Sequence, residues 1–197
     1  MNATQHSTLH PAIRECAEAV AATASGIREE QLQDRTPCEK FTVAELVDHL
    51  GGTLLSAARA ARKEAQPGEV SAAPAMTPQA LADSAGRAAA AWSDPAAYDG
   101  TTEFGPGEMP ASLAASITLH ELALHGWDLA QATGRPFGLS QDTERAAVGA
   151  VEQLAEQARR NGSYGPPVPV PSDAPAFASP SRRGTSLLNP NRTRNSS

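Results

Sequence analysis

The chain has 197 residues, of which 40% are hydrophobic, 4% aromatic and 19% charged, and its net charge at pH 7 is -6. This length fits one domain, and an acidic chain lacks the basic surface that a nucleic-acid partner requires. No apolar run approaches the ~20 residues of a membrane helix, and the first residues lack the basic and apolar regions of a secretory signal. We therefore expect a cytoplasmic protein with neither nucleic-acid nor membrane partners.

The sequence contains two cysteines, Cys16 and Cys38, and neither belongs to a Cys-x-x-Cys pair. This usage excludes a disulfide framework and a thiolate-rich zinc site, and it is typical of a reducing compartment. Cys38 stands next to Glu39, an acidic neighbour that would not lower the pKa of its thiol. We therefore interpret Cys38 as a small packing residue.

Alanine, the strongest helix former, occupies 39 positions, and the alternating β-branched and aromatic runs of strands are nearly absent. An all-α fold is therefore predicted. The first helix is expected over residues 11–33, because apolar residues recur there at helical spacing and a proline is tolerated in a first turn. The second is expected over residues 42–65, since Thr42 and Glu45 have the spacing of a capping box.

The later helices are indicated by signals at their ends. A third helix is predicted over residues 77–92, because Thr77 precedes a proline of the kind found in first turns. Thr101–Phe104 favours a short extended segment ahead of a Gly-Pro-Gly turn. A fourth helix is predicted over Ala111–Thr133, with Gly134 at its C-terminal end, and a fifth over residues 140–160.

Short connections between long amphipathic helices favour an up-and-down four-helix bundle with one additional helix. We assign this bundle to residues 1–165. Residues 166–197 are rich in Pro, Ser and Arg, and they offer too little apolar surface to offset the entropy lost on ordering. This C-terminal tail is therefore predicted to be disordered.

Two ionisable residues of the fourth helix predict a metal site. On a helical wheel, Glu121 and His125 lie one turn apart between two apolar rows. Burial of an unpaired carboxylate is costly, and this spacing lets a carboxylate oxygen and an imidazole nitrogen bind one cation. His49, at the edge of the apolar face of the second helix, is the best third ligand. Two histidines and one carboxylate suit zinc, or another borderline divalent ion such as nickel, and leave one position open.

The same three residues have simpler interpretations. Glu121 and His125 could form a hydrogen-bonded pair within their helix, and His49 could pair with Glu45, one turn before it. A structural bundle without metal is then the third reading of the chain. It would be supported if His49 lay more than about 8 Å from the Glu121 and His125 donors, because zinc bonds span only about 2 Å each.

Two neighbours of the predicted ligands have supporting roles. Asp128 shares the side of Glu121 and could orient a ligand histidine, as metal-bound imidazoles usually require; its alternative is a surface charge that meets Arg135. His120 points about 140° away from His125 on the wheel, which makes it a poor ligand. We interpret it as a packed histidine, or as one that contacts the metal ligands without binding the ion itself.

Two motif-bearing segments together resemble a known family. The matching residues are Thr36-Pro37-Cys38, Phe41-Thr42-Val43, Leu46-Val47-Asp48-His49-Leu50, Glu121, His125-Gly126-Trp127-Asp128-Leu129-Ala130 and Thr133-Gly134. In this pattern the chain resembles the actinobacterial metal-binding proteins of the DinB-like superfamily, which are related to the metal-binding domain of mycothiol-dependent maleylpyruvate isomerase. The resemblance covers roughly residues 9–175.

The resemblance implies a DinB-like four-helix bundle that holds one divalent metal through His49, Glu121 and His125, with Asp128 orienting a ligand. It also implies a low-molecular-weight thiol, mycothiol, bound to the metal as its thiolate. A divalent ion lowers the pKa of a thiol and so supplies a nucleophile at neutral pH. The expected activity is S-transfer to, or isomerisation of, a small electrophilic molecule.

Two further expectations accompany this activity. The alternative function is a metal-binding bundle without catalysis, serving a ligand-binding or regulatory role. A homodimer would form through an exposed helix face, although no heptad seam is evident. Beyond Phe177 the sequence departs from the family, which has a short amphipathic terminal helix there, and a frameshifted or otherwise altered C-terminus would explain the difference.

Overall fold

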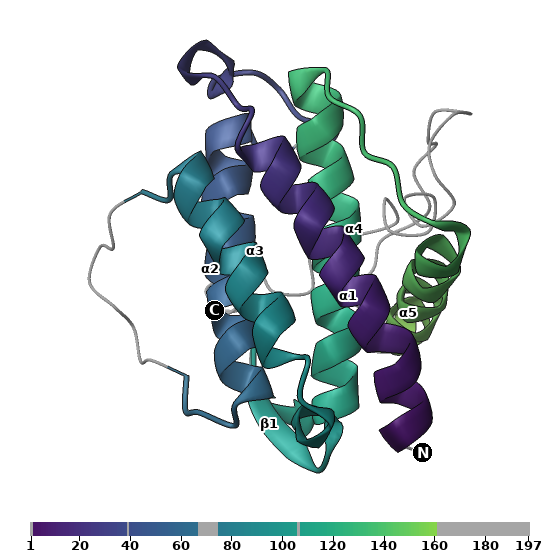
Figure 1. The fold of residues 1–197 in the computed structure, drawn as a ribbon. Helices are drawn as coiled ribbons and strands as arrows, with labels where there is room; N and C mark the ends of the chain where they lie inside the picture. The colour runs from purple at the N-terminus through teal and green to yellow at the C-terminus, as the bar shows by residue number, and fades with distance from the viewer. Residues whose placement is uncertain (1, 39, 67–74, 106, 161–197) are drawn as a thin grey trace.

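The computed structural model describes residues 2–38, 40–66, 75–105 and 107–160, and these form a mostly helical fold with one small sheet (Figure 1). The five α-helices are α1 (Asn2–Ala24), α2 (Val43–Ala61), α3 (Pro78–Ala91), α4 (Ala111–Thr133) and α5 (Gln141–Arg160). Two short 3-10 helices, η1 (Glu29–Gln31) and η2 (Pro95–Tyr98), and two strands, β1 (Thr101–Phe104) and β2 (Gly107–Pro110), complete the described elements.

Helices α1 to α4 surround one apolar core. Both α1 and α2 pack against α3 and α4, and α5 lies outside, against α1 and α4 (Figure 1). The large aliphatic residues with no exposed surface come from all four inner helices: Ile13 and Val20 of α1, Leu46, Leu50 and Leu54 of α2, Leu81 of α3, and Leu119, Leu122 and Leu129 of α4. Burying one such side chain contributes roughly 1.5–3 kcal/mol, so this core is the main source of stability.

The helix directions depart from the predicted up-and-down order, because α2 and α3 run the same way (Figure 1). The backbone amide of Met76, just before α3, donates to Asp48 near the start of α2 at 2.9 Å. The connection from α2 to α3, residues 62–77, is long enough to allow this parallel arrangement. A chain of this length can extend roughly 50 Å, whereas the 19 residues of α2 rise only about 28 Å. The chain can therefore return to the start of α2 before α3 begins.

The first helix differs from its prediction at both ends. It begins at Asn2 rather than at residue 11, so Pro11 lies inside it, and it ends at Ala24 rather than at residue 33. Arg135, just beyond the end of α4, contacts the chain where α1 has ended. The Arg135 guanidinium lies against Gly26, where a Cβ atom would be 1.7 Å from Cζ, and Nη2 donates to the Gly26 carbonyl at 2.6 Å. That carbonyl is thus satisfied by a distant side chain.

The capping signals of the later helices are confirmed. Thr42 and Glu45 form the expected capping box, with the Thr42 amide donating to the Glu45 carboxylate at 2.8 Å. Thr77 caps α3 by accepting from the amide of Ala80 at 3.1 Å. Helix α4 has the predicted bounds and ends at Gly134, whose φ of 66° is the left-handed conformation that glycine adopts readily. Helix α2 ends at Ala61, four residues before the predicted end.

The prediction of an all-α fold is wrong in one region, because β1 and β2 pair as an antiparallel hairpin. The extended segment Thr101–Phe104 was expected, but its partner was not. Within β1, Phe104 is fully buried and the Thr102 hydroxyl donates to the Ala60 carbonyl of α2 at 2.7 Å. In β2 no side chain is fully buried, so its sequence lacks the alternation that indicates a strand.

Among the described helices, none has a stretch long and apolar enough to cross a membrane. The predicted disordered tail, residues 166–197, and the proposed alteration beyond Phe177 lie outside the described residues.

Candidate metal centre

Three predicted ligands from two helices lie together. His49 comes from α2, and Glu121 and His125 come from α4. Each offers one ligand atom, and these atoms lie within 4.8 Å of one another. The separation of more than about 8 Å expected for a metal-free bundle is therefore not observed.

The helices position these side chains in different ways. Helix α4 crosses the interior, and every residue from 114 to 130 is buried, so Glu121 and His125 are held inside the protein with 0% and 3% of their side chains exposed. His49 lies between the buried Leu46 and Leu50 rows, at the edge of the core, and keeps 14% exposure. The cluster is thus closed on the α4 side and reaches the surface through His49.

Glu121 is the centre of the cluster. Its Oε2 lies 3.3 Å from Nε2 of His49 and 3.6 Å from Nε2 of His125. Burial alone raises the pKa of Glu121, but the hydrogen bond with His49 and the nearby histidines outweigh it and lower that pKa to about 2. Its other oxygen, Oε1, is buried and has no hydrogen-bond partner among the described residues. A buried, charged carboxylate whose second oxygen has no hydrogen bond is a favourable ligand for a cation.

Asp128 lies one turn after His125 and fixes its ring. The Oδ2 atom of Asp128 is 3.2 Å from Nδ1 of His125, and both side chains are 3% exposed. Burial by itself lowers the pKa of His125, but the Asp128 hydrogen bond and the charges of Glu121 and Asp128 raise it above its ordinary value. With Asp128 accepting from Nδ1–H, the lone pair of Nε2 faces Glu121. Arg135, the alternative partner of Asp128, instead bonds Gly26.

His120 lies outside the group of donors. It is 3% exposed, and burial lowers its pKa to about 4, so it is neutral at pH 7. Its Nδ1 atom has no hydrogen-bond partner among the described residues. We therefore describe His120 as a packed neutral histidine in the same buried helix as the candidate ligands.

The turn before α2 brings two residues to the cluster that wheel reasoning missed. Phe41 stacks on His49, with ring centroids 5.0 Å apart and an interplanar angle of 18°, and meets His125 edge-on at 6.4 Å. Cys38 forms a second group of possible ligands with His125 and Asp128. Burial, and then the charge of Asp128, raises the pKa of the Cys38 thiol, which agrees with the prediction that it is not activated. The only sequence signal was the Thr-Pro-Cys and Phe-Thr-Val pattern of the family.

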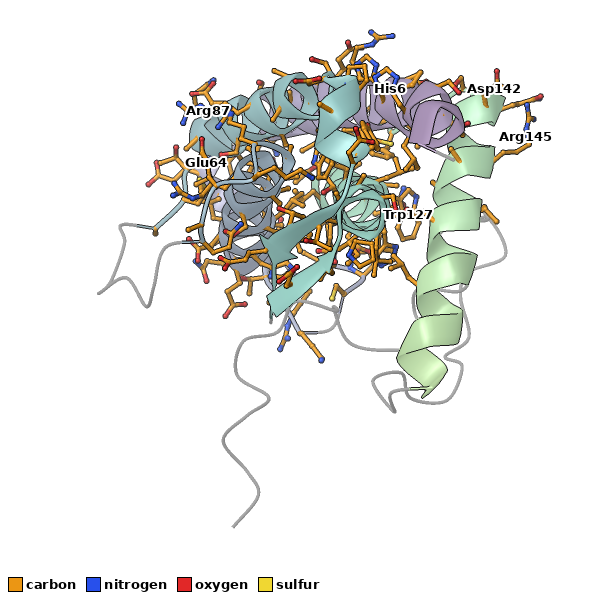
Figure 2. All side chains as sticks on the ribbon, turned by 90° about the horizontal axis from the view of Figure 1, so that it is seen from below. His6, Glu64, Arg87, Trp127, Asp142 and Arg145 are labelled. Carbon is orange, nitrogen blue, oxygen red and sulfur yellow. The ribbon has the colours of Figure 1, made fainter. Side chains whose placement is uncertain are left out.

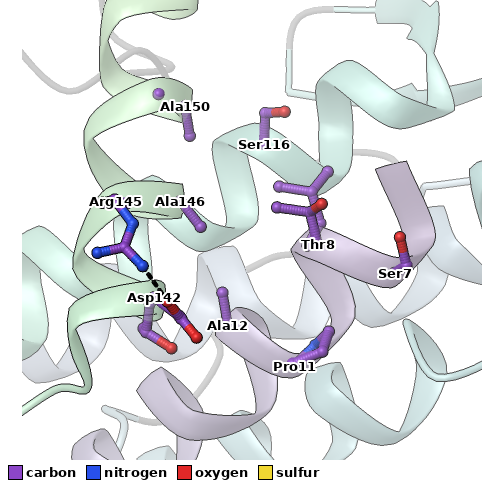
Figure 3. Close-up of a pocket in the computed structure, with 12 residues that line it drawn as sticks. Ser7, Thr8, Pro11, Ala12, Ser116, Asp142, Arg145, Ala146 and Ala150 are labelled. Carbon is purple, nitrogen blue, oxygen red and sulfur yellow. Dashed lines mark hydrogen bonds and ion pairs between the residues drawn. The ribbon is translucent and has the colours of Figure 1, made fainter. Parts of the chain in front are cut away.

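A separate pocket of about 650 Å³ lies between α1, α4 and α5 (Figure 3). Ser7 and Thr8 of α1, Ser116 of α4 and the Asp142–Arg145 ion pair of α5 line it. None of the candidate metal ligands belongs to its wall. Trp127, which lies on the α5 side of the bundle in Figure 2, is 7% exposed and packs in the core, as predicted. This pocket therefore carries no part of the candidate metal chemistry.

Residues 13–130 match the family model described as the mycothiol maleylpyruvate isomerase N-terminal domain. The chain belongs to this family. Two Mycobacterium tuberculosis proteins, uncharacterized protein Rv0738 and its counterpart MT0763 from a second strain, are each 29% identical over 141 residues, or 70% of this chain and 71% of theirs.

Solved structures with the same fold come from the enzyme that gives the family its name. This chain resembles the mycothiol-dependent maleylpyruvate isomerase with a TM-score of 0.55 and 19% identity. It resembles a histidine-to-alanine mutant of that enzyme with a TM-score of 0.56 and 15% identity. Each match covers 78% of this chain and 72% of the other. The resemblance to this family expected from the motifs is confirmed.

Proposed function

We propose that this chain is a divalent-metal-binding protein that uses a low-molecular-weight thiol, mycothiol, as an S-transferase or isomerase acting on a small electrophilic molecule. The proposal includes a DinB-like four-helix bundle as the scaffold, zinc as the preferred ion and nickel as the runner-up. The observation that carries it is the cluster of His49, Glu121 and His125 within 4.8 Å. Membership of the mycothiol maleylpyruvate isomerase N-terminal domain family supports the thiol.

The cluster fits a divalent ion on the chemistry of its own atoms. The buried Oε1 of Glu121 has no hydrogen-bond partner among the described residues, and an ion would satisfy it. Two imidazoles and one carboxylate are a donor set that suits zinc. Three protein donors also leave one position for an outside molecule, which is the pattern of catalytic rather than structural zinc sites.

Residues around the cluster orient the metal ligands and leave one side open to solvent. A bound divalent ion would lower the pKa of a thiol and so favour the thiolate. Asp128 holds the His125 ring through Nδ1, which keeps Nε2 directed at the cluster. Phe41 stacks on His49 and so covers one face of its ring. Because His49 is the exposed member, the thiol and the electrophile would enter from its side.

The test is the metal content of untagged protein, measured by elemental mass spectrometry in wild type, His49→Ala and His125→Ala. We expect about one equivalent in wild type and less than about 0.1 in either variant, because two remaining donors bind zinc weakly. The matched control is the double variant His6→Ala/His10→Ala. These two histidines stack on each other in α1, outside the cluster, and their loss should leave the content unchanged.

Loss of metal in the control, or unchanged metal in His49→Ala and His125→Ala, would refute the proposed ligands. Where wild type holds one equivalent, the second assay follows consumption of maleylpyruvate and of other electrophiles with mycothiol. Turnover that disappears with His49→Ala supports the enzyme. A full metal content without any thiol-dependent turnover would instead favour the non-catalytic metal-binding role.

A further inference from the structure

A second group of possible metal ligands shares His125 with the first group. Cys38, His125 and Asp128 each offer one ligand atom, and these atoms lie within 4.8 Å of one another. The first cluster faces Nε2 of His125, which is 3.6 Å from Glu121, whereas Asp128 lies 3.2 Å from Nδ1. Two groups of possible ligands therefore share one imidazole, with Asp128 at Nδ1 and Glu121 at Nε2.

A hydrogen-bonded turn fixes the backbone that carries Cys38. The Phe41 amide donates to the Cys38 carbonyl at 2.9 Å. The Thr36 hydroxyl lies within hydrogen-bond distance of the same carbonyl, at 2.9 Å, and of the Phe41 carbonyl, at 2.8 Å. Cys38 is half-buried, whereas Asp128 and His125 are 2% exposed. The turn thus holds the partly exposed Cys38 thiol close to two buried metal ligands, where an ion from solvent could reach it.

We propose that Cys38, His125 and Asp128 form a second cation position, selective for a divalent ion softer than zinc, that competes with the first position for His125. Thiolate sulfur selects softer ions than a set of nitrogen and oxygen donors does. One thiolate and one carboxylate also balance the two charges of such an ion. The first position, with no sulfur, lacks this preference.

Competition follows from the proton count of the imidazole. A neutral ring has one nitrogen with a lone pair and one N–H group. When an ion binds at the second position, the Cys38 S–H proton leaves to solvent, a sulfur–metal bond forms, and the ring proton moves from Nδ1 to Nε2. Glu121 then accepts from Nε2–H, so Nε2 can no longer hold an ion at the first position. One equivalent of metal, never two, should therefore bind in this region.

The experiment is a titration with Cd²⁺, in the presence of a phosphine reductant that does not compete for the ion. A thiolate bound to Cd²⁺ gives a charge-transfer band in the ultraviolet. Wild type should develop this band at one equivalent, and Cys38→Ser should lose it. The matched control is Cys16→Ser, which changes the only other cysteine, fully buried in the core, and should retain the band.

His49→Ala separates this proposal from the function proposed above, because His49 belongs only to the first position. It should lose zinc and keep the thiolate band with Cd²⁺. If Cys38→Ser unfolds by circular dichroism, Asp128→Ala is the second variant, and its band should need at least about tenfold more Cd²⁺. Stoichiometry is measured in His6→Ala/His10→Ala protein, which lacks the partly exposed histidine pair of α1. A band that persists in Cys38→Ser, no band in wild type, or two equivalents bound together would overturn the proposal.

Discussion

Removal of the Glu15 carboxylate is expected to loosen α5 from the bundle. Glu15 of α1 accepts from the Ser140 amide at 2.5 Å, from the Ser140 hydroxyl at 2.7 Å and from the Thr143 hydroxyl at 2.5 Å. These contacts join α1 to the first turn of α5. A hydrogen bond to a charged group contributes roughly 1.5–3 kcal/mol. Because Glu15 is only half-buried, we expect Glu15→Ala to cost about 2 kcal/mol in total.

The assay is hydrogen exchange of the α5 amides followed by mass spectrometry. About 2 kcal/mol corresponds to roughly 30-fold faster exchange if α5 opens locally. Glu18→Ala is the matched control: it lies three residues later in α1, gains the same helix propensity, and loses only an ion pair with Arg14 whose side chains are 58% and 64% exposed. Equal exchange of α5 in the two variants would refute the role of Glu15.

The same contacts make the effect depend on pH. Burial alone raises the pKa of Glu15, but its hydrogen bonds with Thr143 and Ser140 outweigh it and hold the pKa below its ordinary value of 4.5. A carboxylate with a lowered folded-state pKa stabilises the protein fully above its unfolded value, and this contribution is lost as the pH falls through the folded value. The difference in melting temperature between wild type and Glu15→Ala should therefore be full at pH 7 and shrink below about pH 4.5.

Two further predictions concern packing, each with a control on the same type of element. Leu50→Ala should lower the free energy of unfolding in urea by roughly 2–5 kcal/mol because Leu50 is fully buried, whereas Leu55→Ala, at 37% exposure, should cost less than about 1 kcal/mol. Comparable losses would contradict the assigned core. Gly126→Ala should cost about 1–3 kcal/mol because the new Cβ would lie 2.7 Å from Phe137 and Val20. Gly52→Ala, with open space around it, should stabilise by roughly 0.5–1 kcal/mol, and a destabilised Gly52→Ala would contradict this account.

Local signals explain which parts of the fold could be predicted. The capping box of Thr42 and Glu45 and the glycine at 134 act within one turn, so α2 began and α4 ended where expected. The wheel of α4 also placed Glu121 and His125 on one side, and the structure brings His49 to them. These features depend on the spacing of neighbours along one helix.

The features that escaped prediction depend on contacts that the hydrophobic pattern of one element does not encode. Just after α1, the Gly26 carbonyl accepts from Arg135, which lies 109 residues away. Strand β2 has no buried alternation of its own and forms because β1 pairs with it. Cys38 reaches the metal region through a turn whose hydrogen bonds cannot be read from residue types alone.

Because the candidate ligands lie on two helices, a bound ion would link α2 to α4. His49 and Glu121 are separated by 72 residues, so an ion held by both would tie two distant parts of the chain together in the folded state only, because the unfolded chain has no preformed site. By mass action, an ion that binds only the folded chain stabilises it by about 2.7 kcal/mol at a free concentration about 100 times its dissociation constant. The ion would then act as a removable cross-link between α2 and α4, and a chelator would cut it without breaking a covalent bond.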